Sequence, residues 1–234
     1  MPDVQGVLFD FNGTLARLES WGESHQDVFD RWGLTAAGKR WGDGWLVGPV
    51  DGEDHREHSQ DRDGYHRWEL SRLAARARRC GVPADRIDGV VRELDRANKT
   101  LTMSLYDDVV EVLSELRRRN VAVAVCSNWY WDLDAVIDQV GLTDLVDVAV
   151  TSARAGARKP HSLIFHRTLQ LCGLQPAEAL FVGDSWQADV IGPLAAGIRA
   201  VHLWRPERAA EAAPPRRADV PRLSSLYEVI GQIS

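Results

Sequence analysis

The sequence predicts a doubly wound α/β fold: a parallel sheet with helices on both faces and a helical domain inserted after the first strand. Five short apolar runs rich in β-branched residues are typical of buried strands. From residue 107 onward these runs alternate with helical patterns, which is typical of a parallel sheet covered on both faces. Roughly a hundred residues separate the first two runs, and a stretch that long is rarely structureless. The runs span residues 4–9, 121–126, 146–150, 180–182 and 200–203.

The helices of the core are predicted from apolar residues spaced three and four positions apart. The second of them ends at Gly141 and the third ends near Gly173, because glycine favours the left-handed conformation that closes a helix. A linker rich in charge and proline, residues 205–221, precedes the last helix. The predicted core helices span 109–116, 133–140, 163–171 and 223–230.

The segment between the first strand and residue 107 is predicted to be helical. The stretch "SWGES" matches a capping box, with Ser20 as N-cap and Glu23 three residues later, and Gly33 ends this first helix. Residues 38–64 are glycine-rich, charged and aperiodic, which is typical of a long loop. Two further helical patterns span residues 65–79 and 87–94.

These patterns divide the chain into two domains. We expect a catalytic core made of residues 1–15 and 107–234, and a helical cap made of residues 16–106. The first strand then belongs to the core, and the cap is inserted directly after it.

Composition excludes several functional classes. With 234 residues, 44% of them apolar, the chain can bury a substantial core. The net charge of −6 argues against a nucleic-acid partner, and the sequence has no 18-residue apolar run that could span a membrane. The 3 cysteines are scattered without a CxxC pair, which argues against a disulfide framework and fits a reducing cytoplasm. We therefore expect a cytoplasmic protein, monomeric or homodimeric, without nucleic-acid or membrane partners.

Polar side chains follow four of the predicted strands. In an open parallel sheet, ligands bind beyond the carboxyl ends of the strands, so these side chains should share one site. They carry carboxylate, hydroxyl, amide and ammonium groups. The residues are Asp10, Ser127 with Asn128, Lys159, and Asp184 with Asp189.

The carboxylates of this set predict a magnesium site. Asp10, Asp184 and Asp189 provide oxygen and no nitrogen ligands, which suits a hard cation that keeps several waters. Their three negative charges, set against Mg²⁺ and the ammonium of Lys159, sum to about zero. An anionic substrate could therefore bind here.

The remaining groups suit a phosphate. The hydroxyls of Ser127 and Thr14 and the main-chain amides around Asn12 and Gly13 could bind its oxygens, beside the metal and Lys159. Such an arrangement stabilises the charge that develops during phosphoryl transfer.

The motifs of the chain resemble those of the haloacid dehalogenase-like hydrolase superfamily. Four motifs occur in the family's order: "DFNGT" from residue 10, "VAVCSN" from 123, "RKP" from 158 and "GDSWQAD" from 183. The resemblance covers residues 1–15 and 107–234, and the segment between matches the helical cap of many members. It implies a Rossmann-like catalytic core.

The resemblance also implies a role for each motif residue. The first-motif acid of the family is the nucleophile that forms an aspartyl-phosphate, which corresponds to Asp10. Ser127 and Lys159 would bind the phosphoryl group, and Asp184 and Asp189 would hold Mg²⁺ together with Asp10 and the main-chain carbonyl of Asn12. The implied function is a magnesium-dependent phosphatase of a small phosphorylated metabolite.

Asn12 departs from the family pattern. The family's phosphatases place a second Asp there, as an acid that protonates the leaving oxygen and then as a base that activates water. An amide can hydrogen-bond to that oxygen but cannot transfer the proton, and losing such a group typically costs roughly 10²- to 10⁴-fold in rate. We therefore expect a substrate with a good leaving group. Three alternatives stay open: a metal-independent 2-haloacid dehalogenase, a phosphotransferase, and a catalytically impaired protein that binds a phosphorylated ligand.

The stretch "NWYWD", residues 128–132, provides candidates for substrate contact. It follows Ser127 at a strand end, so Trp129, Tyr130 or Trp131 could form an apolar wall beside the substrate. The same residues could equally pack as a hydrophobic staple onto the next helix. Asn128 and Trp129 are retained as candidate substrate-binding residues.

Overall fold

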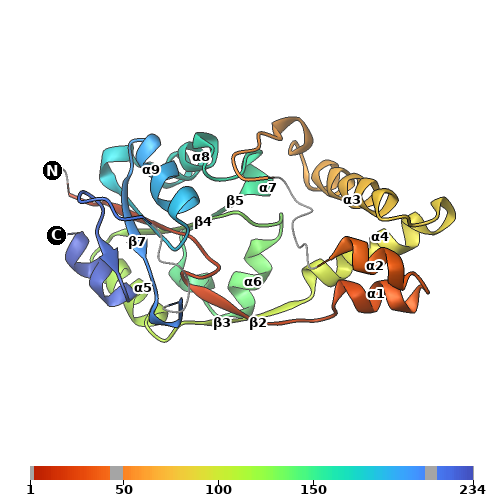
Figure 1. Cartoon of the computed structure of the whole chain (residues 1–234). Helices are drawn as coiled ribbons and strands as arrows, with labels where there is room; N and C mark the ends of the chain where they lie inside the picture. The colour runs from red at the N-terminus through yellow and green to blue at the C-terminus, as the bar shows by residue number, and fades with distance from the viewer. Residues whose placement is uncertain (1–2, 43–49, 209–214, 234) are drawn as a thin grey trace.

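A computed structural model describes residues 3–42, 50–208 and 215–233. Its main sheet has six strands in the order β5-β4-β1-β6-β7-β8, and each neighbouring pair is parallel. Figure 1 shows this sheet with helices packed around it, and the helices α1 to α4 set apart from it. The first strand therefore lies in the middle of the sheet, between β4 and β6. The strands are β1 (Gly6–Phe9), β4 (Ala122–Ser127), β5 (Val148–Thr151), β6 (Ala179–Gly183), β7 (Arg199–Leu203) and β8 (Arg222–Leu223).

Helical elements cover both faces of this sheet. The α-helices are α5 (Val109–Arg118), α6 (Leu133–Gln139), α7 (Ser152–Ala155), α8 (Ser162–Cys172) and α9 (Gly192–Ala195). The π-helix η5 (Trp186–Ile191) precedes α9. Short 3₁₀ helices are η3 (Thr143–Leu145), η4 (Pro176–Glu178), η6 (Pro206–Arg208) and η7 (Leu226–Gln232).

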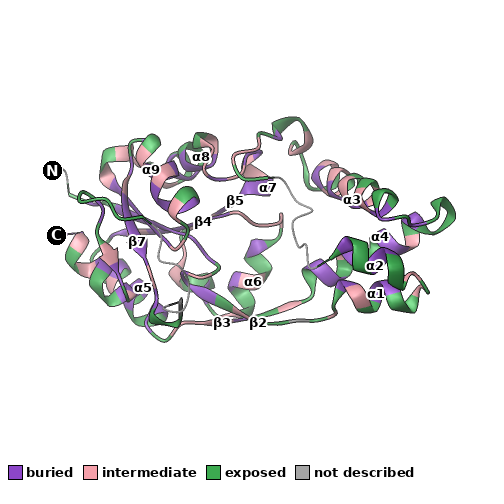
Figure 2. Ribbon diagram, viewed as in Figure 1, coloured by how far each residue is buried: buried purple, intermediate pink, exposed green. Residues whose placement is uncertain are grey.

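Alternation along β1 assigns the helices to the two faces. Val7 and Phe9 belong to the apolar cluster that α5, α6 and η7 cover. Leu8 belongs to a second cluster on the opposite face, which includes residues of α8 and of the turn after α9. All three residues are fully buried, so the central strand is enclosed by helices on both sides (Figure 2). The doubly wound α/β prediction is confirmed.

Predicted core elements occur in the predicted order, with ends shifted by a few residues. The exception is the carboxyl end, where the predicted last helix, 223–230, is the short strand β8 followed by η7. Part of the predicted linker, residues 209–214, lies outside the described residues.

Between β1 and α5 the chain forms a helical insertion bounded by two strands. β2 (Ala16–Trp21) leads into it and pairs antiparallel with β3 (Leu101–Leu105), which leads out. The helices α1, α2, α3 and α4 pack on an apolar cluster of their own (Figure 2). Their bounds are α1 (His25–Arg31), α2 (Thr35–Trp41), η1 (Arg56–His58), α3 (Arg62–Arg79), η2 (Ala84–Arg86) and α4 (Ile87–Lys99).

Two predictions for the insertion are wrong. Ser20 lies in β2 and caps no helix; the N-cap of α1 is Ser24, whose side chain accepts a hydrogen bond from the Asp27 amide. The loop predicted over 38–64 begins within α2 and also contains η1 and the start of α3, while its residues 43–49 lie outside the described residues. No helix in the described ranges has the length and apolarity needed to span a bilayer.

Candidate active site

Most of the predicted site residues line one cavity beyond the carboxyl ends of β1, β4 and β6. The strand order places these three side by side, and the consecutive strands β5 and β6 lie on opposite sides of β1. Ligands bind at such a switch point in doubly wound sheets. The cavity has a volume of about 210 Å³, and the predicted residues that line it are Asp10, Asn12, Ser127, Asn128, Trp129, Lys159, Asp184 and Asp189.

Asp10 is held by hydrogen bonds from two predicted partners. The Ser127 hydroxyl donates to Asp10 Oδ1 over 2.9 Å, and the Lys159 ammonium donates to the same oxygen over 2.7 Å. Asp10 and Lys159 are only 7% and 1% exposed, respectively, so both charges lie largely out of water. One carboxylate oxygen thus carries both contacts.

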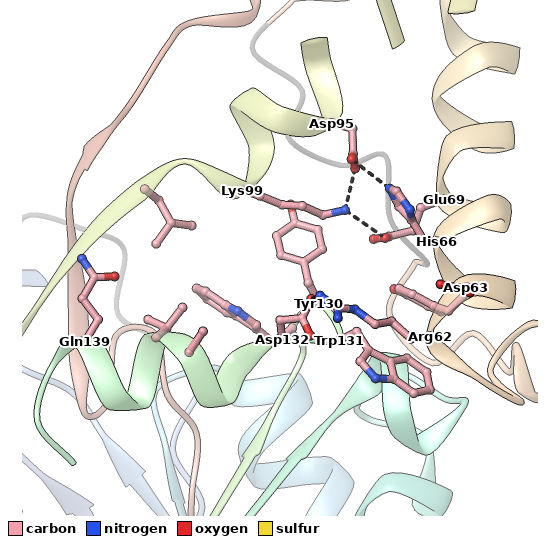
Figure 3. A pocket seen from close by; sticks show the side chains of 15 residues that line it. Arg62, Asp63, His66, Glu69, Asp95, Lys99, Tyr130, Trp131, Asp132 and Gln139 are labelled. Atoms are coloured by element: carbon pink, nitrogen blue, oxygen red, sulfur yellow. Dashed lines mark hydrogen bonds and ion pairs between the residues drawn. The ribbon is translucent and has the colours of Figure 1, made fainter. Parts of the chain in front are cut away.

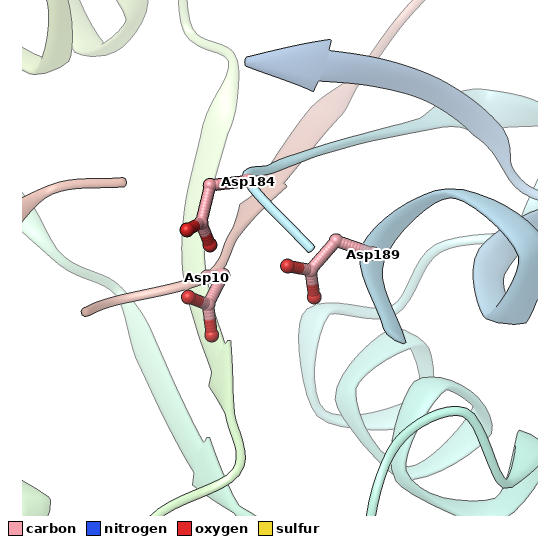
Figure 4. A group of neighbouring side chains, drawn as sticks. All are labelled: Asp10, Asp184 and Asp189. Carbon is pink, nitrogen blue, oxygen red and sulfur yellow. The ribbon is translucent and has the colours of Figure 1, made fainter. Parts of the chain in front are cut away.

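Three carboxylates converge at this point (Figure 4). Oxygen atoms of Asp10, Asp184 and Asp189 all lie within 4.8 Å of one another. Lys159 also donates to Asp189 Oδ1, over 2.6 Å. With all four groups ionised, the cluster carries a net charge of −2, which a divalent cation would balance. The all-oxygen donor set fits Mg²⁺.

The cluster shifts the ionisation of its members. Burial acts to lower the pKa of Lys159, but the charges of Asp10 and Asp189 outweigh it and raise that pKa above its ordinary value. Burial raises the pKa of Asp189; Lys159 opposes this shift and Asp10 adds to it. An additional cation would stabilise the ionised form of Asp189.

The turn after Asp10 is shaped by Gly13. This residue has φ of +88°, and a Cβ there would lie 2.5 Å from Asp184 Oδ2, so the Asn-Gly turn brings the main chain against the carboxylate. Gly13 and Thr14 do not line the cavity. Thr14 is fully buried, and its hydroxyl has no hydrogen-bond partner among the described residues. Their contact with a phosphate stays a prediction.

Asn128 has a structural role that the sequence pattern did not reveal. Its Oδ1 accepts a hydrogen bond from the Lys159 main-chain amide over 2.7 Å, and its Nδ2 donates to the Lys159 carbonyl over 3.2 Å. The amide therefore joins the end of β4 to the segment that carries Lys159. Asn128 and Lys159 are 31 positions apart in the sequence, so their contact is apparent only in the folded chain.

Two residues that the sequence analysis left outside the site, Asp51 and Arg158, also line the cavity. Asp51 comes from the insertion, and its Oδ1 accepts a hydrogen bond from Arg158 Nε over 2.8 Å. It lies in the stretch predicted as an aperiodic loop, where no spacing or motif marks a residue as functional.

Trp129 lines a second, larger cavity of about 420 Å³ between the insertion and the segment after β4 (Figure 3). Tyr130 and Trp131 also line it, so the predicted aromatic wall faces a cavity. Phe11 packs edge-on against Trp129, with ring centroids 5.7 Å apart. The helices α3 and α4 provide charged lining residues, and these are Arg62, Asp63, His66, Glu69, Asp95 and Lys99.

The charged residues of this larger cavity interact with one another (Figure 3). Lys99 Nζ lies 2.7 Å from Asp95 Oδ1 and 3.6 Å from Glu69 Oε2, and His66 Nε2 lies 2.9 Å from Asp95 Oδ2. Burial raises the pKa of Glu69 to about 7, although Lys99 opposes the shift.

Comparison with known proteins identifies the family. The sequence profile described as "haloacid dehalogenase-like hydrolase" matches residues 4–197, which is most of the chain. The protein belongs to the haloacid dehalogenase-like hydrolase family. The family resemblance drawn from the four motifs is therefore confirmed.

Relatives in this family include named phosphatases. The chain is 37% identical over 138 residues, 55% of its length, to ribulose-1,5-bisphosphate 5-phosphatase from Halopiger xanaduensis, and the match spans 57% of that enzyme. It is 30% identical over 170 residues, 70% of its length, to bovine haloacid dehalogenase-like hydrolase domain-containing protein 3, covering 68% of that protein. The matches therefore span between about half and two thirds of these relatives.

A solved structure of the family has the same fold. A phosphatase of the haloacid dehalogenase family from Thermococcus onnurineus aligns with a TM-score of 0.66 and 20% identity, over 99% of this chain and 98% of that one. At this identity the likeness shows the fold alone, and it extends across the helical insertion as well as the sheet.

Proposed function

We propose that this hydrolase is a magnesium-dependent phosphatase of a small phosphorylated metabolite and acts through an aspartyl-phosphate on Asp10. The observation that carries the proposal is the environment of the Asp10 carboxylate. Its Oδ1 accepts hydrogen bonds from Ser127 and Lys159, and it belongs to a group of three carboxylates. The phosphatase names of the relatives support the same activity.

In this proposal Asp10 attacks the phosphorus atom, and Lys159 and Ser127 bind the phosphoryl oxygens. Asp184 and Asp189, with Asp10 and the main-chain carbonyl of Asn12, would hold Mg²⁺. The ion would supply positive charge against the negative charge of the transferring group. Lys159 is buried and its pKa is raised, so it stays protonated and can neutralise a phosphoryl oxygen throughout the reaction.

The helical insertion acts as a cap in this proposal. Residues 16–106 would form the cap and residues 1–15 and 107–234 the core, with the cap excluding water from the strand ends during reaction. The larger cavity between the insertion and the segment after β4 supports this role, because both parts of the chain line it.

The remainder of the substrate would occupy that larger cavity. Trp129 lines both cavities, so the two adjoin at this side chain. Four carboxyl groups line the larger cavity against two cationic side chains, Arg62 and Lys99. With histidine neutral, the excess is two negative charges when Glu69 is ionised and one when it is protonated, and the pKa of Glu69 is raised to about 7. Aromatic rings with carboxylates favour a cationic or uncharged group and disfavour an anionic one.

The activity is tested with an aryl phosphate, whose leaving group departs without a proton. We expect phosphate release with Mg²⁺, loss of release with EDTA, and loss in Asp10→Asn. Halide release from a 2-haloacid without metal would replace the proposal with a dehalogenase. Transfer of the phosphoryl group to an added alcohol in place of water would show that the protein is a phosphotransferase. Saturable binding of the aryl phosphate without turnover would show that it is a binding protein.

The preference of the larger cavity is tested with three aryl phosphates whose leaving groups have matched acidity. One carries an ammonium group, one is uncharged and one carries a carboxylate. We expect the lowest kcat/KM for the carboxylate, and a smaller difference between the ammonium and the carboxylate compounds in Glu69→Gln. Equal kcat/KM values would exclude a charge preference.

A further inference from the structure

The cavity of about 210 Å³ is lined by a carboxylate that does not belong to the three proposed to hold Mg²⁺. Four aspartates line it, and three of them, Asp10, Asp184 and Asp189, form the group with oxygens within 4.8 Å of one another. The fourth is Asp51, which the insertion provides. The proposed reaction needs a proton acceptor when water attacks the aspartyl-phosphate, and the Asn12 amide cannot act as one.

The main chain fixes Asp51 beside this cavity. Residues 50–55, which we call the strap, run along residues 156–159, directly before and at Lys159. Hydrogen bonds join the two segments in both directions: the Gly52 amide to the Arg158 carbonyl over 3.2 Å, the Arg158 amide to the Glu53 carbonyl over 3.0 Å, and the His55 amide to the Gly156 carbonyl over 2.7 Å. The strap is therefore docked on the segment that carries Lys159.

Side chains hold the strap at two further points. Glu53 accepts a hydrogen bond from Arg72 of α3 over 2.8 Å, and Arg158 Nε donates to Asp51 Oδ1 over 2.8 Å. The Asp51 side chain is 58% exposed, so water reaches it.

We propose that Asp51 is the general base of the second half-reaction and takes over the role that the Asn12 amide cannot perform. The inference rests on the proposed phosphatase function. A water oxygen forms a bond to phosphorus while the bond between phosphorus and Asp10 Oδ breaks. The proton of that water passes to Asp51, Asp10 is restored as a carboxylate, inorganic phosphate leaves, and Asp51 returns its proton to solvent.

Rapid-quench kinetics with an aryl phosphate separate the two half-reactions. Release of the aryl alcohol reports attack by Asp10, and decay of acid-precipitable phosphoenzyme reports attack by water. In Asp51→Asn we expect an unchanged burst of aryl alcohol and a phosphoenzyme that decays roughly 10²- to 10⁴-fold more slowly. Asp54→Asn is the matched control, because Asp54 belongs to the same strap but does not line the cavity; its phosphoenzyme should decay at the wild-type rate.

A purely structural role of Asp51 predicts different results. Loss of the strap would displace Lys159 and slow both half-reactions together, and that outcome would overturn the proposal. So would an unchanged phosphoenzyme lifetime in Asp51→Asn. In Asp51→Ala we expect added formate, a small carboxylate base, to restore phosphoenzyme decay in proportion to its concentration; absence of this rescue would also overturn the proposal. Wild-type protein that releases no aryl alcohol would instead refute the phosphatase function itself.

Discussion

The side-chain amide of Asn128 binds both polar main-chain atoms of Lys159, accepting from the amide over 2.7 Å and donating to the carbonyl over 3.2 Å. Lys159 in turn bridges Asp10 and Asp189. Asn128 therefore positions the ammonium through the main chain, without a contact between the amide and the ammonium.

Asn128→Ala should lower kcat more than it raises KM. Without the amide, the segment at Lys159 loses two hydrogen bonds at the end of β4, and a displacement of about 1 Å in such a site can cost on the order of 10²-fold in rate. Steady-state kinetics on an aryl phosphate measure both constants. Gln60→Ala, which removes an exposed amide bound to the Arg56 carbonyl, is the control. A wild-type kcat in Asn128→Ala would contradict the positioning role.

Asn12→Asp should accelerate reactions whose leaving group needs a proton. A carboxylic acid at this position can protonate an alkoxide, and a positioned acid contributes roughly 10²- to 10⁴-fold. We expect the first half-reaction with an alkyl phosphate to gain in rate, and with an activated aryl phosphate to change little. Rapid-quench measurements on both substrates test this. An equal change for the two would show that Asn12 does not limit protonation of the leaving group.

Asp108→Ala should destabilise the core strongly. Asp108 and Arg205 are each 5% exposed and form two hydrogen bonds, 3.0 and 3.1 Å long. Burial acts to raise the pKa of Asp108, but hydrogen bonds from Arg205, Ser225 and the Leu226 amide outweigh it and hold that pKa below its ordinary value. Removing the carboxylate deprives the buried guanidinium of this counter-charge and leaves it the hydrogen bond to the Thr14 carbonyl. Breaking a buried ion pair in this way typically costs about 3–5 kcal/mol.

Urea unfolding measures this loss. The exposed pair of Arg217 and Asp219 provides the control, because Asp219→Ala breaks an ion pair whose side chains are 46% and 60% exposed. Such a surface pair typically contributes about 0–1 kcal/mol. Comparable losses in the two variants would contradict the expected difference between the buried and the exposed pair.

His55 should make stability depend on pH. It is 2% exposed, its Nε2 has no hydrogen-bond partner among the described residues, and its ring stacks on Trp68 with centroids 5.0 Å apart. Burial lowers the pKa of His55 from 6.5 to about 4, against the opposing charges of Glu53 and Asp54. The unfolded chain then binds more protons between these values, so stability falls as the pH drops below 6.5. At pH 5 the loss from this group is about 2 kcal/mol.

Unfolding free energies at pH 7.5 and pH 5 test this prediction. His55→Phe keeps an aromatic ring and removes the titrating group, so its pH dependence should be smaller than that of the wild type. His58→Phe is the control, because His58 also stacks on Trp68 but has a side chain that is 38% exposed. Equal pH dependence in wild type and His55→Phe would contradict the prediction.

The sequence predicts five strands of the six-stranded sheet because each is a short, mainly apolar run, and polar residues follow four of these runs. The sixth strand, β8, has only two residues and was not predicted. The sequence alone assigns Asp10, Ser127 and Asp184 to one site, since the carboxyl ends of parallel strands meet at one edge. Local patterns failed where pairing is distant. Residues 16–21 pair with 101–105, and a capping-box match at Ser20 competes with the true N-cap at Ser24, four residues later.

The role of Asp51 was also beyond prediction from the sequence. Its position depends on main-chain hydrogen bonds to residues 156–159, more than a hundred positions away. No sequence periodicity relates residues 50–55 to residues 156–159. Only the folded structure therefore shows that Asp51 lines the cavity.

The antiparallel pair β2 and β3 carries both covalent connections of the insertion to the core. At its far end the Gly22 amide donates to the Thr100 carbonyl over 2.7 Å, so the chain leaves and returns at neighbouring points. A short turn could close the two strands into a hairpin without interrupting any strand of the six-stranded sheet. The fold is thus suited to exchange of modules: gene rearrangement or a protein engineer could graft a different insertion at this point and retain the central strand with its aspartate.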